Sequence, residues 1–226
     1  MALSAPTPLD RPATSLEPPL GPLAAAAATL FVAGLVVSTV QAGGNPFPSP
    51  FGAADDALAY FRDHPGAVRT GAVLQFASAI PLTLYVAAAT ARVRRLTDGF
   101  PAALTTVGGT LAAAFLLCSG VVNWVLTVPE VATEPALLRA AHTLAFLFGG
   151  PGNVVATGLF IAGIALSAWP GRRVARWLLI TGLVIAVIAL CTTASLAVTG
   201  AAFLLPIARF TGMAWLIAVG FLLPRA

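Results

Sequence analysis

Six long apolar segments dominate this chain, and they leave it few folds other than a bundle of membrane-spanning helices. Each is long enough to cross the hydrocarbon core of a bilayer, which takes about 20 residues of helix. In lipid a helix satisfies its own backbone hydrogen bonds within one segment. We therefore predict an all-α protein, a six-helix transmembrane bundle whose spans cover residues 22–41, 67–92, 101–127, 137–168, 174–198 and 203–223.

The composition indicates that lipid is the solvent for much of this chain. Of its 226 residues, 58% are hydrophobic and 9% are charged, whereas soluble domains carry about 25% charged residues. The two cysteines, Cys118 and Cys191, lie in apolar segments, where a cysteine usually acts as a small hydrophobic residue. The net charge of +4 comes from arginines in short loops, so we expect the lipid bilayer, and no nucleic acid, as a partner.

Two stretches outside the spans have a character of their own. Residues 1–21 are rich in proline and alanine and are predicted to form a disordered tail, which leaves 22–226 as one transmembrane domain. Residues 53–64 follow a turn-rich loop and read as a short amphipathic helix, stopped by Pro65. We predict that it packs on the bundle outside the membrane, with Tyr60 and Phe61 buried and Asp55 and Asp56 exposed.

The arginines predict the orientation. With six spans, eight of them share the side of the two termini, and four belong to the other side. Because cytoplasmic loops carry an excess of positive charge, both termini are expected in the cytoplasm of a multi-pass cell-membrane protein. The eight are Arg11, Arg92, Arg94, Arg95, Arg172, Arg173, Arg176 and Arg225, and the four are Arg62, Arg69, Arg139 and Arg209.

One stretch carries a family resemblance. Residues 51–96, FGAADDALAYFRDHPGAVRTGAVLQFASAIPLTLYVAAATARVRRL, combine an outer loop, a short helix and a GAVLQFASAIPL helix that ends in an arginine cluster. This layout resembles the uncharacterised bacterial multi-pass membrane family DUF4386, a domain of unknown function. The resemblance implies a multi-pass protein, and it brings no assigned activity and no catalytic residues.

The fourth span contains a break. Gly149, Gly150, Pro151, Gly152 and Asn153 interrupt an apolar run at bilayer depth. A proline inside a helix removes one hydrogen bond and clashes with the preceding turn. Broken helices are tolerated in membranes where protein or a water-filled cavity covers the freed groups. We predict a kink or local unwinding at 148–153, with Asn153 pointing toward the second or third span.

Polar residues inside the spans allow two interpretations. Gln75, Asn123, Asn153 and Arg209 could line an outward-facing polar cavity that binds an unidentified small molecule. Alternatively, the uncharged groups could serve as hydrogen-bonding links between helices. Ser78, Ser119, Thr192, Thr193 and Ser195 add to either set, since most of the strong hydrogen-bonding groups fall in the outward half of the bundle.

Arg209 lies about six residues into the last span. We expect its side chain to reach outward to the membrane surface, because Pro206 can mark a late start of the helix. If Arg209 is buried instead, Glu130 or Glu134 is the expected partner.

These observations favour an integral membrane protein of unknown role, non-enzymatic and without a cofactor. A small-molecule transporter or ligand-binding bundle is the alternative. A metal- or haem-dependent redox protein is a second alternative, which rests only on His64 and His142 as weak candidate ligands. The sequence shows none of the phosphate-loop, HExxH, CxxC or GxSxG motifs. It does not indicate an oligomeric state.

Overall fold

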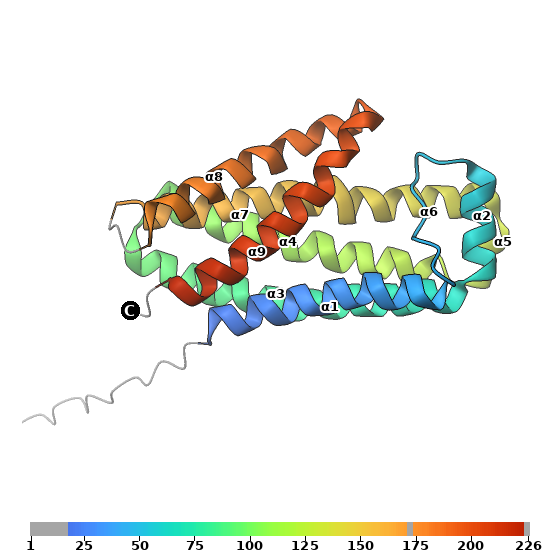
Figure 1. The fold of residues 1–226 in the computed structure, drawn as a ribbon, viewed down its shortest axis with the longest axis horizontal. Helices are drawn as coiled ribbons and strands as arrows, with labels where there is room; N and C mark the ends of the chain where they lie inside the picture. The colour runs from blue at the N-terminus through green and yellow to red at the C-terminus, as the bar shows by residue number, and fades with distance from the viewer. Residues whose placement is uncertain (1–17, 171–173, 224–226) are drawn as a thin grey trace, which may run out of the picture.

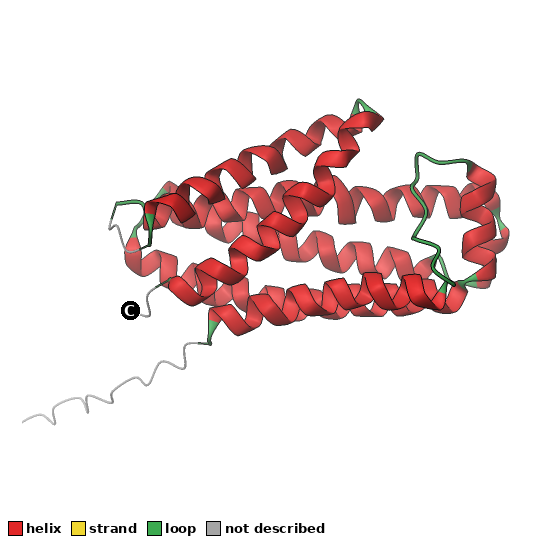
Figure 2. Ribbon diagram, in the orientation of Figure 1, coloured by secondary structure: helices red, strands yellow, loops and turns green. Residues whose placement is uncertain are grey.

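The computed structural model describes residues 18–170 and 174–223, and every regular element in them is a helix (Figures 1 and 2). The predicted tail at 1–21 therefore falls largely outside the described residues, and its last two positions belong to the first helix. The elements are α1 (Leu20–Gln41), α2 (Ala54–Asp63), α3 (Pro65–Leu96), α4 (Phe100–Val125), α5 (Pro129–Thr133), α6 (Pro135–Leu147), η1 (Phe148–Gly152), α7 (Asn153–Ala168), α8 (Arg176–Cys191), η2 (Thr192–Leu196), η3 (Thr199–Phe203) and α9 (Leu204–Leu222).

Six helical segments in the described chain are long and apolar enough to cross a membrane, as the sequence predicted. Their ends differ from the predicted ones by at most four residues. They are Leu20–Gln41, Pro65–Leu96, Phe100–Val125, Pro135–Ala168, Arg176–Leu196 and Thr199–Leu222. Many large apolar side chains on these helices face outward, among them Val36, Ile80, Val107 and Val187, each more than half exposed. Such a surface suits contact with lipid.

The six segments close into a ring. Helix α1 packs on α3, α3 on α4, α4 on α7, α7 on α8, α8 on α9, and α9 returns to α1. The α4–α7 contact is close because both helices present glycine there. A Cβ added at Gly108 would lie 2.5 Å from the backbone nitrogen of Phe160, and one added at Gly163 would lie 2.5 Å from that of Thr105. Small residues allow this approach of two backbones in a membrane.

The half of the bundle nearer the chain ends is filled by the main hydrophobic core, which includes Tyr85, Phe160, Ile164 and Trp215. Two of its large polar side chains are paired, whereas the hydroxyl of Thr90 is buried without a hydrogen-bond partner. The Tyr85 hydroxyl donates to the carbonyl of Leu216 at 3.1 Å, and the Trp215 indole donates to that of Leu178 at 2.7 Å. This half is a sealed, well-packed interior.

The other half ends at α2, and we call it the α2 end. Figure 1 shows that the turn between α8 and α9 stops short of this end, whereas α1, α3, α4 and α6 continue toward it. The hairpin α8–α9 therefore leaves the α2 half of the bundle with fewer covering helices. Helices α2 and α5 lie across its tip.

Helix α2 packs as the sequence predicted. Tyr60 and Phe61 are 8% and 1% exposed, while Asp55 and Asp56 are exposed. Phe47, from the preceding loop, makes edge-to-face contacts with both aromatic rings. Burial raises the pKa of the Tyr60 hydroxyl above its ordinary value.

Arg92 departs from the sequence analysis, which placed it in a loop at the end of the second span. It lies inside α3, is 3% exposed, and donates to the carbonyls of Leu223 at 3.3 Å and Pro18 at 3.2 Å. A guanidinium with five donors can bridge several carbonyls at once. Arg92 thus joins α3 to the described start and end of the chain.

Candidate ligand-binding cavity

The fourth span is broken where the sequence predicted. Helix α6 ends at Leu147, a short π-helical segment follows, and α7 begins at Asn153. Gly150 has φ −84° and ψ −107°, outside the helical range. A Cβ added at Gly152 would lie 2.9 Å from the carbonyl oxygen of Leu147, so this turn needs glycine. Pro151 cannot donate a backbone hydrogen bond, which removes one bond of a regular helix.

The break releases one carbonyl for a side chain. In a regular α-helix the backbone N–H of Asn153 would bond to the carbonyl of Gly149. Here it bonds to the carbonyls of Phe148 and Gly150 instead. The carbonyl of Gly149 accepts a hydrogen bond from the guanidinium of Arg209, on α9.

Asn153 points into the bundle, also as predicted. Its side chain is 6% exposed, and its amide donates to the carbonyl of Ala112 on α4 at 2.8 Å. This bond ties the start of α7 to the third span. Asn153 also lines the inner end of the cavity described below.

Gln75, Ser119 and Asn123 form one hydrogen-bonded group between α3 and α4. The Gln75 amide nitrogen donates to the Ser119 hydroxyl at 3.0 Å, and the Asn123 amide nitrogen donates to the Gln75 oxygen at 2.9 Å. Ser119 in turn donates to the carbonyl of Ala145 on α6 at 3.0 Å. The side-chain oxygen of Asn123 is buried and has no hydrogen-bond partner.

Arg209 does not reach outward, so the expectation that it snorkels to the membrane surface is wrong. Its guanidinium carbon lies 5.1 Å from the centre of the Phe31 ring. Its Nε is buried without a hydrogen-bond partner. The physical reason is the position of α9, whose first turns lie partway along the bundle rather than at its α2 end (Figure 1).

The acidic partner expected for a buried Arg209 is also absent from the described chain. Glu130 on α5 and Glu134, directly after α5, are both exposed, and neither forms an ion pair with Arg209. The described contacts of the guanidinium are one carbonyl and one aromatic ring. Among the described residues, no carboxylate lies in the cavities beside this positive charge.

Three adjoining cavities share Arg209 and Phe31 in their walls. The inner one has a volume of about 50 Å³ and includes Asn153. The second, of about 300 Å³, reaches Asn123 and the broken segment at Gly149 and Gly150. The third, of about 140 Å³, includes Gln75 and Asn123. No described acidic residue lines any of the three. Together these cavities form the candidate site.

The loop of residues 43–52 lies over the cavity of about 300 Å³, and we call this loop the strap. Phe47, Pro48 and Pro50 of the strap line this cavity. A hydrogen-bond distance of 3.1 Å separates the Pro48 carbonyl from Nε2 of His142, on α6. Phe51 packs against Phe146 with ring centres 5.1 Å apart. The turn-rich sequence GGNPFPSPFG thus covers the α2 side of the site.

The remaining predicted residues play other parts. His142 lines the large cavity and contacts Phe47 and Phe61, whereas His64 contacts Tyr60. The described residues contain no group of three or more His, Cys, Asp or Glu that could hold a metal ion. Thr192 donates to the carbonyl of Ala189, and Ser195 is buried with an unpaired hydroxyl, so neither joins the Gln75 group.

Sequence reasoning missed Phe31 and the strap as parts of the site. Phe31 lies in an apolar run of α1, where nothing distinguishes it from its neighbours. The strap did offer a signal in the sequence, because this proline-rich loop contains two phenylalanines, Phe47 and Phe51. Such rings need a surface to cover, and here that surface is the cavity.

No family model, no curated protein and no solved structure matches this chain. The resemblance of residues 51–96 to the DUF4386 family stays a prediction. The six long apolar helices indicate a multi-pass integral membrane protein.

Proposed function

We propose that this protein is a non-enzymatic, ligand-binding membrane bundle whose cavity opens toward the outside of the cell. Both termini lie in the cytoplasm in this proposal, because Arg94 and Arg95 in the last turn of α3 and Arg176 at the start of α8 carry positive charge on the side of the termini. The bound molecule occupies the space between Arg209 and the Gln75–Ser119–Asn123 group.

The observation that carries the proposal is the unpaired Nε of Arg209. A buried charge without a partner is costly, and unpaired buried donors cost about 1–3 kcal/mol even when neutral. Nearby, the Asn123 oxygen is also unpaired. Both atoms belong to residues that line the same cavities, where a polar ligand could bond to them.

The packing favours binding over passage through the protein. The core around Tyr85, Phe160 and Trp215 fills the half nearer the termini, so the cavity is closed on that side. The polar groups that line the site are amides, hydroxyls, the imidazole of His142 and the guanidinium of Arg209. This set can hold a ligand by hydrogen bonds and charge, and it offers no base paired with a nucleophile.

A purely structural role for the polar group is the competing explanation. It is supported by the bonds between Gln75, Ser119 and Asn123, each of which would contribute about 0.6–2 kcal/mol in a membrane. It does not account for the Nε of Arg209, which has no hydrogen-bond partner among the described residues.

A thermal-unfolding screen tests the proposal. The full chain, in a neutral maltoside detergent, is followed by the fluorescence of its four tryptophans during titration with organic anions, cations and neutral compounds. At least one compound is expected to raise the unfolding temperature of the wild type and of Arg69→Gln, an exposed arginine outside the cavity. The increase should disappear in Arg209→Gln. If no compound acts, or all variants respond alike, the cavity does not bind ligands.

A further inference from the structure

The cavity has two routes by which a ligand could enter, and they differ in what covers them. Toward the α2 end it is covered by the strap, which is held by the His142 and Phe146 contacts. Sideways it is bordered by Leu35 on α1, Phe146 on α6 and Phe210 on α9, which all line the cavity of about 300 Å³. We call this lateral opening the window.

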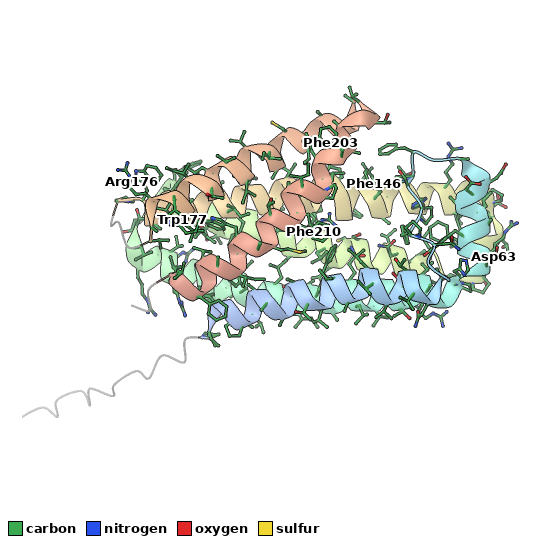
Figure 3. All side chains as sticks on the ribbon, viewed as in Figure 1. Asp63, Phe146, Arg176, Trp177, Phe203 and Phe210 are labelled. Atoms are coloured by element: carbon green, nitrogen blue, oxygen red, sulfur yellow. The ribbon has the colours of Figure 1, made fainter. Side chains whose placement is uncertain are left out.

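The window lies within the membrane-spanning part of the bundle and has an apolar rim. Leu35 and Phe210 are 42% and 45% exposed, and both belong to helices that can cross the membrane. Figure 3 labels Phe210 on α9 and Phe146 on α6, which line the same cavity from two different helices. A rim of this kind faces acyl chains rather than water.

Behind this apolar rim lies a positive charge. Arg209 stays protonated at any physiological pH, and no described acidic residue lines the cavity. A guanidinium pairs best with planar or tetrahedral oxyanions such as carboxylate and phosphate. The amide groups of Gln75 and Asn123 line the adjoining space and add hydrogen-bonding capacity beside the anion.

The sizes of the cavities determine the direction that an alkyl chain on a bound anion can take. The inner cavity holds about 50 Å³, room for only a few waters at roughly 10–15 Å³ each. An alkyl chain attached to an anion at Arg209 would therefore leave through the larger cavity and the window, into the lipid.

We propose that the ligand is an anionic amphiphile, in which a carboxylate or phosphate head group pairs with Arg209 and an alkyl chain passes through the window into the bilayer. This inference rests on the proposed function and names its ligand class. Free fatty acids and phosphate-bearing lipids share this chemistry, and the head group that binds distinguishes them.

Native mass spectrometry of the full chain in neutral detergent provides the test, with probes that share a twelve-carbon chain. Dodecanoate and dodecyl phosphate represent the two head groups, and dodecanol and dodecyltrimethylammonium are the neutral and cationic controls. Binding of at least one anion, weakened about tenfold or more in Arg209→Gln and unchanged in Arg69→Gln, is expected from the loss of a charge-assisted hydrogen bond. Preference for dodecanoate assigns the fatty-acid source, and preference for dodecyl phosphate assigns the phospholipid source.

The other outcomes separate the two proposals. Equal binding of dodecanol, unaffected by Arg209→Gln, would overturn the anionic class and leave a ligand-binding cavity in place. Butyrate that binds as tightly as dodecanoate would overturn the amphiphile. If none of these probes and no compound of the thermal screen binds, the proposed function itself fails.

A photoreactive probe tests the direction of the chain. Dodecanoate with a diazirine at its terminal carbon should label Leu35 and Phe210 in the wild type, and this labelling should disappear in Arg209→Gln. The loss in the variant excludes labelling by probe dissolved in the detergent. Labels on Ala27 or Ala28, which line the inner cavity, would contradict passage through the window.

Discussion

The two halves of this bundle differ in how their buried polar side chains are paired and in how fully their interior is packed. Near the chain ends, Tyr85 and Trp215 are buried and paired with backbone carbonyls, and large apolar side chains fill the space between them. Toward α2, Arg209 and Asn123 each keep a buried polar atom unpaired beside open space. Stability is therefore concentrated in one half, and the capacity to bind in the other.

The largest effect is expected from a cavity made in the packed half. Phe160 is 0% exposed and contacts the Tyr85 ring edge-to-face. Phe160→Ala should lower the free energy of unfolding by about 3–5 kcal/mol, as large-to-small core substitutions do. Denaturant titration followed by tryptophan fluorescence measures this change. A loss below about 1 kcal/mol would mean that the two halves do not differ in packing.

Substitution of Tyr85 should lower stability, whereas substitution of Arg209 should leave it nearly unchanged. Tyr85→Phe removes a satisfied hydrogen bond and should cost about 0.5–1.5 kcal/mol. Arg209→Met removes a buried charge that has no described carboxylate partner but also leaves the Gly149 carbonyl without its donor, so the two effects oppose each other and stability should stay nearly unchanged. The same titration compares them, in the absence of added ligand. Strong destabilisation by Arg209→Met would show that Arg209 is a structural link rather than a ligand-binding residue.

Pro151→Ala probes the boundary between the halves. Restoring a backbone donor should partly straighten the α6–α7 span and weaken the contact between Arg209 and the Gly149 carbonyl. The distance between spin labels at the exposed residues Leu137 and Leu166 should therefore increase, and double electron–electron resonance measures this distance. Pro135→Ala, in the first turn of α6, is the matched control and should change nothing. Equal distances in all three proteins would mean that Pro151 does not maintain the break.

The smallest effect is expected at α2. The hydroxyl of Tyr60 is buried without a partner, and burial raises its pKa above 10. The folded protein therefore favours the neutral Tyr60 hydroxyl. This preference stabilises the fold fully below pH 10, and the stabilisation is lost as the pH rises through the pKa of the folded state. Tyr60→Phe should be neutral or slightly stabilising at pH 7 and should flatten this alkaline decline. Unfolding temperatures of the wild type and of Tyr60→Phe, measured between pH 8 and 11, test both expectations. If the alkaline decline is the same in the two proteins, Tyr60 does not cause it.

The features that could be predicted from the sequence are those that local chemistry determines. The length of the apolar segments predicted the six helices. The pattern of Tyr60 and Phe61 with two aspartates predicted α2, and the glycines beside Pro151 predicted the break. Gln75 and Asn123 could be placed at one depth of the bundle, although not in one hydrogen-bonded group, because they are 48 residues apart.

The features that could not be predicted depend on how helices cross. Arg209 turns inward because α9 starts partway along the bundle and because the broken span frees the Gly149 carbonyl. Neither fact can be read from residues 203–223 alone. Arg92 likewise became buried because α3 extends beyond the predicted end of its span.

The contacts of Arg92 have a practical consequence for protein engineering. One guanidinium holds the carbonyls of Pro18 and Leu223, and a Cβ added at Gly220 would lie 2.9 Å from the backbone nitrogen of Gly21. The described beginning and end of the chain are thus neighbours, as circular permutation requires. The bundle should accept a covalent join there, with new termini opened in the loop between α3 and α4, and the ring of helices would keep its order.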